Sequence, residues 1–170
     1  MIIEERVERS QYVKLITWIV SFIILMAGIV FPVLILWVNQ DMMSKVIGAS
    51  VLCLIFFTLI FTVAYQPRKL ILSETHIIME RILGQVYISY SDITDISLYH
   101  RENVAEIRIF GIGGLGGYIG KFYNSKIGFY TAYVGDYSQA FLIKINNREK
   151  YVMSCRHAEK IVEEVKSRLK

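Results

Sequence analysis

Two stretches of the chain contain no charged side chain, and they decide the class of protein. The first follows Lys14 and is 26 residues long, and the second follows Lys45 and is 22 residues long. A helix of about 20 apolar residues crosses a hydrocarbon core of roughly 30 Å. The pattern therefore predicts two transmembrane spans, over residues 15–38 and 46–66. Because the link at 39–45 is short, the spans should form a hairpin.

A cleaved signal peptide and a buried helical pair of a soluble protein are the two alternatives. The first run is too long for a signal-peptide core, no small-residue cleavage site follows it, and a second run comes directly after. Charge-free runs of this length are rare in soluble cores. Basic residues flank the outer ends of the two runs, whereas the link carries only Lys45. The positive-inside rule then predicts cytoplasmic termini, with residues 1–14 as a cytoplasmic segment.

Residues 67–170 have a different pattern of apolar and polar residues, which predicts a separate β-rich domain. Short apolar segments alternate with turn residues, the pattern of about seven or eight strands. The expected strands cover residues 69–72, 77–82, 86–90, 96–99, 106–110, 129–134, 141–145 and 151–154. The glycine-rich stretch Gly111–Gly120 is denser in glycine than a simple turn requires. We expect either a loop projecting from a barrel end near the membrane or a bulged barrel corner.

The last segment of the chain is the only part of this domain with helical periodicity. Apolar residues recur there at offsets of three and four, at Ala158, Ile161, Val162, Val165 and Leu169. Such a stripe predicts an amphipathic helix. Ser154 is the expected N-cap, and Glu164 with Arg168 forms a favourable i,i+4 pair. A set of antiparallel strands closed by one such helix predicts a small barrel whose open end the helix plugs.

Composition and charge narrow the possible functions. The chain has 170 residues, of which 54% are hydrophobic, and a mean hydropathy of +0.43, values that exclude a disordered protein. Residues 68–170 carry 15 Lys and Arg against 11 Asp and Glu, which is the whole surplus of +4. That bias suits a domain beside anionic lipid but is too small to indicate nucleic acid. Cys53 and Cys155 form no disulfide framework, and we expect no metal site.

Two glycine motifs resemble nucleotide-binding signatures only in their letters. Residues 111–116 match G-x-G-x-x-G, but an aromatic, strand-like segment follows where a helix must begin. Gly120 and Lys121 match the end of a P-loop motif, but Phe122 follows them where a Ser or Thr must bind magnesium. We therefore expect no nucleotide or other cofactor.

Two residue pairs were weighed as catalytic groups. Cys155 and His157 lie at a helix start, without a third group to orient them. Asp92 and Asp95 lie in a turn that leads into a strand, where Asp side chains bind the local backbone. Both pairs fit structural roles better, so we expect no enzyme.

One segment combines aromatic and basic residues. It contains Tyr118, Lys121, Phe122, Tyr123, Lys126, Phe129, Tyr130, Tyr133 and Tyr137. Such residues can stack on single-stranded nucleic acid, lie at a bilayer surface, or fill a core on alternate strand positions. Core packing is the simplest explanation for about half of the rings.

The same segment carries a family resemblance. The sequence GGLGGYIGKFYN at residues 113–124, followed by IGFY at 127–130, resembles bacterial membrane proteins with a pleckstrin-homology-like (PH-like) domain after two N-terminal spans. YSDITDI at 90–96 is similar to that family's approach to a middle strand. The resemblance implies a seven-stranded, strongly bent barrel capped by a C-terminal helix, over residues 67–170. It implies no reaction and no catalytic residues.

The resemblance also implies a kind of function. Eukaryotic proteins of this fold hold phosphoinositides with basic residues in and after the first strand, where this chain has Lys69 and the more distant Arg81. We expect a non-catalytic binding or scaffold module, anchored in the bacterial inner membrane at its cytoplasmic face. The alternative is an accessory or regulatory subunit of a transporter or envelope enzyme. Expected partners are the membrane, anionic lipid headgroups, another protein or further copies of the chain, and not nucleic acid. The expected contact surface consists of Arg68, Lys69, Tyr118, Lys121, Tyr123 and Lys126.

Overall fold

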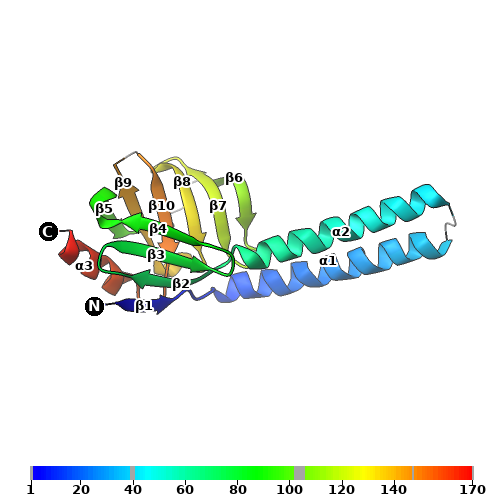
Figure 1. Cartoon of the computed structure of the whole chain (residues 1–170), viewed down its shortest axis with the longest axis horizontal. Helices are drawn as coiled ribbons and strands as arrows, with labels where there is room; N and C mark the ends of the chain where they lie inside the picture. The colour runs from blue at the N-terminus through cyan, green and yellow to red at the C-terminus, as the bar shows by residue number, and fades with distance from the viewer. Residues whose placement is uncertain (1, 39–40, 102–105, 147, 170) are drawn as a thin grey trace.

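Two long helices project from one end of a β domain (Figure 1). The computed structural model describes residues 2–38, 41–101, 106–146 and 148–169. Helix α1 spans Gln11–Val38 and α2 spans Met42–Ala64. Within α1, a buried glycine allows the close approach of α2, because a Cβ at Gly28 would lie 2.7 Å from the Ile55 side chain.

Both helices are long and apolar enough to cross a membrane. Only 12% of the apolar stretch of α1 and 11% of that of α2 is buried inside the protein. The core helices of a soluble protein would be mostly buried. The link is shorter than the sequence indicates, because α2 begins at Met42, and residues 39 and 40 lie outside the described ranges. The Asp41 carboxylate caps α2 by accepting a hydrogen bond from the Ser44 N–H at 3.2 Å.

The β domain contains ten described strands in two sheets. The four-stranded sheet has the order β1-β2-β3-β4, with β1 Ile3–Arg6, β2 Pro67–Leu72, β3 His76–Arg81 and β4 Gln85–Ser89. The six-stranded sheet has the order β5-β9-β10-β8-β7-β6. Its strands are β5 Ile93–Leu98, β6 Glu106–Gly113, β7 Tyr118–Asn124, β8 Gly128–Val134, β9 Ala140–Ile145 and β10 Lys150–Ser154. Neighbouring strands are antiparallel except for the parallel pair β8 and β10.

The main core lies between the two sheets and helix α3 (Ala158–Arg168). Leu70 and Met79 of the small sheet, and Phe141 and Met153 of the large sheet, are fully buried in it. The apolar stripe predicted for the tail faces this core, with Ala158, Ile161, Val162 and Val165 all buried. The predicted i,i+4 ion pair joins Glu164 and Arg168 at 2.8 Å. The amphipathic C-terminal helix is therefore confirmed.

Three features differ from the sequence analysis. The domain has ten described strands in two sheets rather than about seven or eight, because β1 was not predicted and the strand-like segment that forms β7 was not among the expected strands. Strand β1 has the sequence IEER, which lacks the alternation of a half-buried strand, and it forms because β2 offers an open edge. Ser154 is not the cap of α3 but ends β10, where its Oγ accepts a hydrogen bond from the Gly135 N–H at 2.9 Å.

Candidate functional site

The glycine-rich segment, expected to be either a projecting loop or a bulged barrel corner, forms the β6–β7 hairpin. Its turn comprises residues 114–117, and Gly111 and Gly120 are paired across the two strands. Both have positive φ values, +117° and +121°. A Cβ at Gly111 would lie 2.1 Å from the Ile119 carbonyl oxygen. At this pair glycine is required because the two backbones approach too closely for side chains.

The hairpin turn contacts the first helix. The Gly116 N–H donates a hydrogen bond to Thr17 Oγ1 at 2.8 Å, and the Thr17 hydroxyl donates to the Val13 carbonyl at 2.6 Å. The Gln66 side chain packs directly over Gly116, where a Cβ would lie 1.9 Å from its Nε2 atom. The guanidinium of Arg9 donates to Gln66 Oε1 at 2.5 Å. The turn is thereby fixed between the start of α1 and the residues that follow α2.

The β3–β4 turn contacts the second helix. The Leu83 N–H donates a hydrogen bond to the carbonyl of Ala64, the last residue of α2, at 2.8 Å. The Arg81 guanidinium lies 5.2 Å from the centre of the Tyr65 ring, within cation–π range. One turn from each sheet is therefore bound to the base of the helical hairpin.

The N-terminal segment forms a second attachment between α1 and the β domain. Beyond β1, the Val7 N–H donates to the Arg68 carbonyl at 2.9 Å, and the Arg156 N–H donates to the Arg6 carbonyl at 2.9 Å. The Ser10 N–H, just before α1, donates to the Gly135 carbonyl at 3.2 Å. The chain therefore enters α1 from a segment that is already part of the β domain.

Large apolar side chains are exposed at the end of the domain from which the helices emerge. In the β3–β4 turn, 48% of Ile82 and 58% of Leu83 is accessible to solvent. On β6, the edge strand of the large sheet, the exposed fractions are 55% for Ile109 and 73% for Phe110. Figure 1 shows β6 running across this end, beside the base of α2. Large apolar side chains exposed at one end of a domain make that end a candidate interaction surface.

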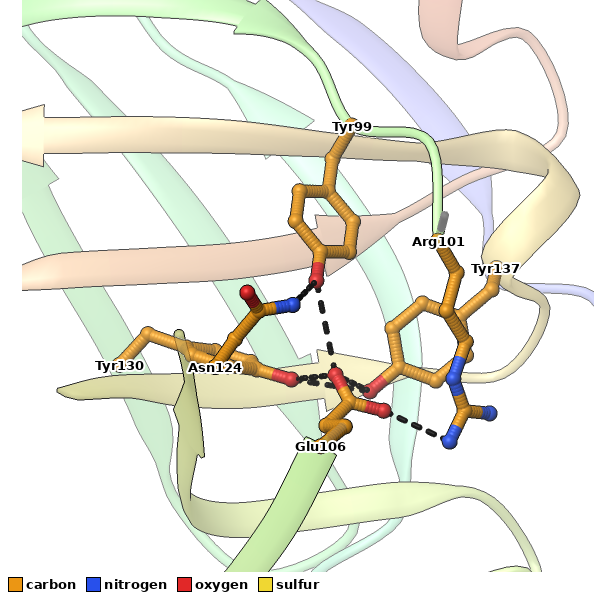
Figure 2. Close-up of polar contacts among 6 residues, drawn as sticks. All are labelled: Tyr99, Arg101, Glu106, Asn124, Tyr130 and Tyr137. Atoms are coloured by element: carbon orange, nitrogen blue, oxygen red, sulfur yellow. Dashed lines mark hydrogen bonds and ion pairs between the residues drawn. The ribbon is translucent and has the colours of Figure 1, made fainter. Parts of the chain in front are cut away.

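A buried carboxylate holds the first residue of β6 (Figure 2). Only 3% of the Glu106 side chain is exposed, and its Oε2 lies 2.7 Å from the Arg101 guanidinium. Its Oε1 accepts hydrogen bonds from the hydroxyls of Tyr130, Tyr137 (3.4 Å) and Tyr99 (3.5 Å). Burial of a carboxylate is costly unless charge and hydrogen bonds compensate it, and here both do.

The aromatic rings around Glu106 form a second, smaller core on the outer face of the large sheet. Burial raises the pKa of Tyr99, Tyr130 and Tyr137, so these hydroxyls remain protonated donors. The Arg101 guanidinium lies 5.2 Å from the Tyr118 ring centre and 4.7 Å from that of Tyr137. The network ties β6 to the segment after β5. Sequence reasoning missed it because its members are spread over residues 99–137.

The structure does not gather the six predicted contact residues into one site. Arg68 and Lys69 of β2 line a hollow of about 460 Å³, where Lys69 pairs with Glu4 at 3.4 Å. Tyr118 belongs to the cluster around Glu106.

The other three residues lie along β7 and the turn after it. Lys121 lines a hollow of about 380 Å³ together with Phe129, whose ring packs at 5.0 Å against Tyr123. Lys126 lines a third hollow, of about 220 Å³. The contact role of all six residues stays a prediction.

The groups weighed as catalytic are engaged in structural contacts. Burial raises the pKa of the Cys155 thiol to about 12, which leaves it protonated and unreactive. The His157 ring binds Glu5 at 3.0 Å, and Asp95 pairs with Lys144 at 2.9 Å. Among the residues that the structure describes, no group of three or more His, Cys, Asp or Glu side chains could hold a metal ion.

Comparison with known proteins gives the family. A search of curated proteins and a search of solved structures found no match. The model of the family described as "Bacterial PH domain" matches residues 68–169, which is more than half of the chain. The match covers β2 to α3 and leaves out the helical hairpin and β1. PH domains are generally non-catalytic binding modules. This chain is a member of the bacterial PH domain family.

Proposed function

We propose that this protein is a membrane-anchored binding module, whose helical hairpin spans the bacterial inner membrane and whose PH domain lies at the cytoplasmic face. The observation that carries the proposal is the exposure of α1 and α2, whose apolar stretches are only 12% and 11% buried. In water, so much exposed apolar surface would be unfavourable, at roughly 25 cal/mol per Å². In a bilayer the same surface is solvated by lipid tails.

The attachment of the hairpin to the domain supports a module held in a fixed orientation. Thr17 of α1 and Ala64 of α2 both bind turns of the β domain. A flexible linker would allow the domain to move freely away from the membrane. Direct attachment instead presents one end of the domain to the lipid surface.

Accessibility of single cysteines tests the anchor and its orientation. The native Cys53 is replaced by alanine, and Cys155 can stay because its buried thiol is unreactive. In intact cells, an impermeant maleimide should label Met42→Cys, at the start of α2. It should label Ser125→Cys, in the turn after β7, only after the membrane is permeabilised. Labelling of Ser125→Cys alone in intact cells would invert the topology, and a protein recovered in the soluble fraction would refute the anchor.

A feature of the hairpin favours a second function, as an accessory subunit of a transporter or envelope enzyme. A shallow apolar groove of about 490 Å³ runs between α1 and α2 and includes Val30 and Ile55. It would fit a helix of another membrane protein. A photo-crosslinking amino acid in place of Val30 should then give one discrete adduct in cells, whereas the same group in place of Ile60, which is 65% exposed and outside this groove, gives none. Only lipid adducts at both positions would argue against this function.

A further inference from the structure

The bases of the two helices carry the aromatic residues that mark a membrane interface. Trp18, next to the turn-binding Thr17, is 75% exposed on α1. Tyr65 directly follows α2. Indole and phenol rings prefer the headgroup level, where one side of the ring is apolar and the other is wet. If the helices span a bilayer, Trp18 and Tyr65 lie at its surface.

The domain turns are bound at this same level. The β6–β7 turn binds Thr17, one residue before Trp18, and the β3–β4 turn binds Ala64, one residue before Tyr65. Strand β6 runs across this end of the domain (Figure 1). Phe110 lies four residues before the turn, which places it about 13 Å to the side at 3.3 Å per residue. Because β6 crosses this end of the domain, that distance runs along the strand (Figure 1).

We propose that Ile82 and Leu83 of the β3–β4 turn, and Ile109 and Phe110 of β6, insert into the headgroup region of the bilayer. The proposal rests on the anchoring proposed above, and it names the lipid surface as the ligand of this end of the domain. Leu83 lies directly against the base of α2, because its N–H donates to the Ala64 carbonyl. Basic residues at the same end, Lys14 on α1 and Arg108 on β6, favour anionic lipid.

The edge strand could instead pair with a strand of a partner protein, but its shape disfavours this. A bulge between Arg108 and Phe110 interrupts its register, and Gly111 follows with a φ of +117°. Bulges and kinks are devices that protect edge strands from further pairing. The headgroup region is hydrated, so unpaired backbone groups of β6 can bind water there, as they could not in the hydrocarbon core.

Depth-dependent quenching of single labels tests the proposal on the full chain. An environment-sensitive fluorophore is attached to Leu83→Cys or Phe110→Cys in the Cys53→Ala background. The protein is reconstituted in vesicles of phosphatidylethanolamine and phosphatidylglycerol. Quenching by a headgroup-level nitroxide lipid is compared with quenching by aqueous iodide. We expect both labels to lose emission to the nitroxide lipid and to be shielded from iodide.

Two control positions separate the failure of this proposal from the failure of the anchor. Ile2→Cys is exposed at the opposite end of the domain and should be quenched by iodide only. Phe57→Cys, exposed in the middle of α2, should respond to a nitroxide placed deep in the acyl chains. If the Phe57 label responds and the Leu83 and Phe110 labels behave like Ile2, the anchor stands and this proposal is overturned. Labels shielded from both quenchers would place another copy of the chain on this end, which also overturns it.

Discussion

The pair Gly111 and Gly120 makes the strongest prediction about the stability of the domain. In Gly120→Ala, the new Cβ would lie 2.3 Å from the Phe110 carbonyl oxygen and 2.9 Å from the Gly111 Cα, and these are backbone atoms that cannot rotate away. The φ of +121° adds a strain of about 1–2 kcal/mol for an alanine. Overpacking adds about 1–3 kcal/mol. The sum of about 2–5 kcal/mol is a large part of a typical stability of about 5–15 kcal/mol.

Gly113→Ala is the matched control, because it makes the same change on the same hairpin. The nearest atom to its new Cβ is a side-chain atom of Arg108, at an ordinary 3.6 Å. Thermal unfolding of the full chain in detergent, followed by near-ultraviolet circular dichroism of its tyrosines, measures both variants. Gly120→Ala should lower Tm by on the order of 10–20 °C, and Gly113→Ala should change it little. Equal melting temperatures would refute the close-approach explanation of the glycine-rich segment.

Three further predictions concern the core, the half-buried Tyr151 and the Glu106 network. Val162→Asp buries a charge in the main core and should lower the free energy of unfolding by about 3–5 kcal/mol. Lys160→Asp, on the exposed face of α3, is the control and should change it little. Similar denaturant midpoints for the two variants would contradict the packing of α3. Burial raises the pKa of Tyr151 to about 12. The native state therefore keeps a proton that the unfolded chain releases above about pH 10. Stability should fall as the pH rises above about 10. Tyr151→Phe should make that alkaline decline shallower in a pH series of unfolding midpoints, and an unchanged slope would contradict it. Arg101→Ala leaves buried Glu106 without its cation and should lower the free energy of unfolding by about 1–3 kcal/mol. In a double-mutant cycle, adding Glu106→Gln should recover part of this loss. Additive losses would show that the pair is not coupled.

Local patterns were sufficient for the elements whose partners need not be known. The two apolar runs predict α1 and α2 because their length and lack of charge depend only on consecutive residues. The stripe containing Val162 and Val165 predicts α3 because a helix repeats every 3.6 residues. Eight of the ten described strands were predicted from short apolar segments between turns. The family resemblance over the β domain is confirmed by the match to residues 68–169.

The remaining features depend on contacts between distant parts of the chain. Strand β1 has no apolar alternation and exists because Ile3–Arg6 pair with a strand more than 60 residues away. Strand β7 contains one glycine, Gly120, which would weaken a strand in isolation, and only the approach of Gly111 explains it.

The Glu106 network and the exposed apolar end of the domain have the same origin. In the sequence, nothing distinguishes Glu106 from a surface carboxylate. Only the folded structure places Tyr130 and Arg101 next to it. Phe110 reads as a core residue of a strand, because sequence cannot tell which strand lies at a sheet edge. The periodicity of the sequence therefore determines which segments become helices and most of the strands. Which side chains face solvent or one another is decided by the pairing order of the strands, which forms only when residues far apart in the chain pack together.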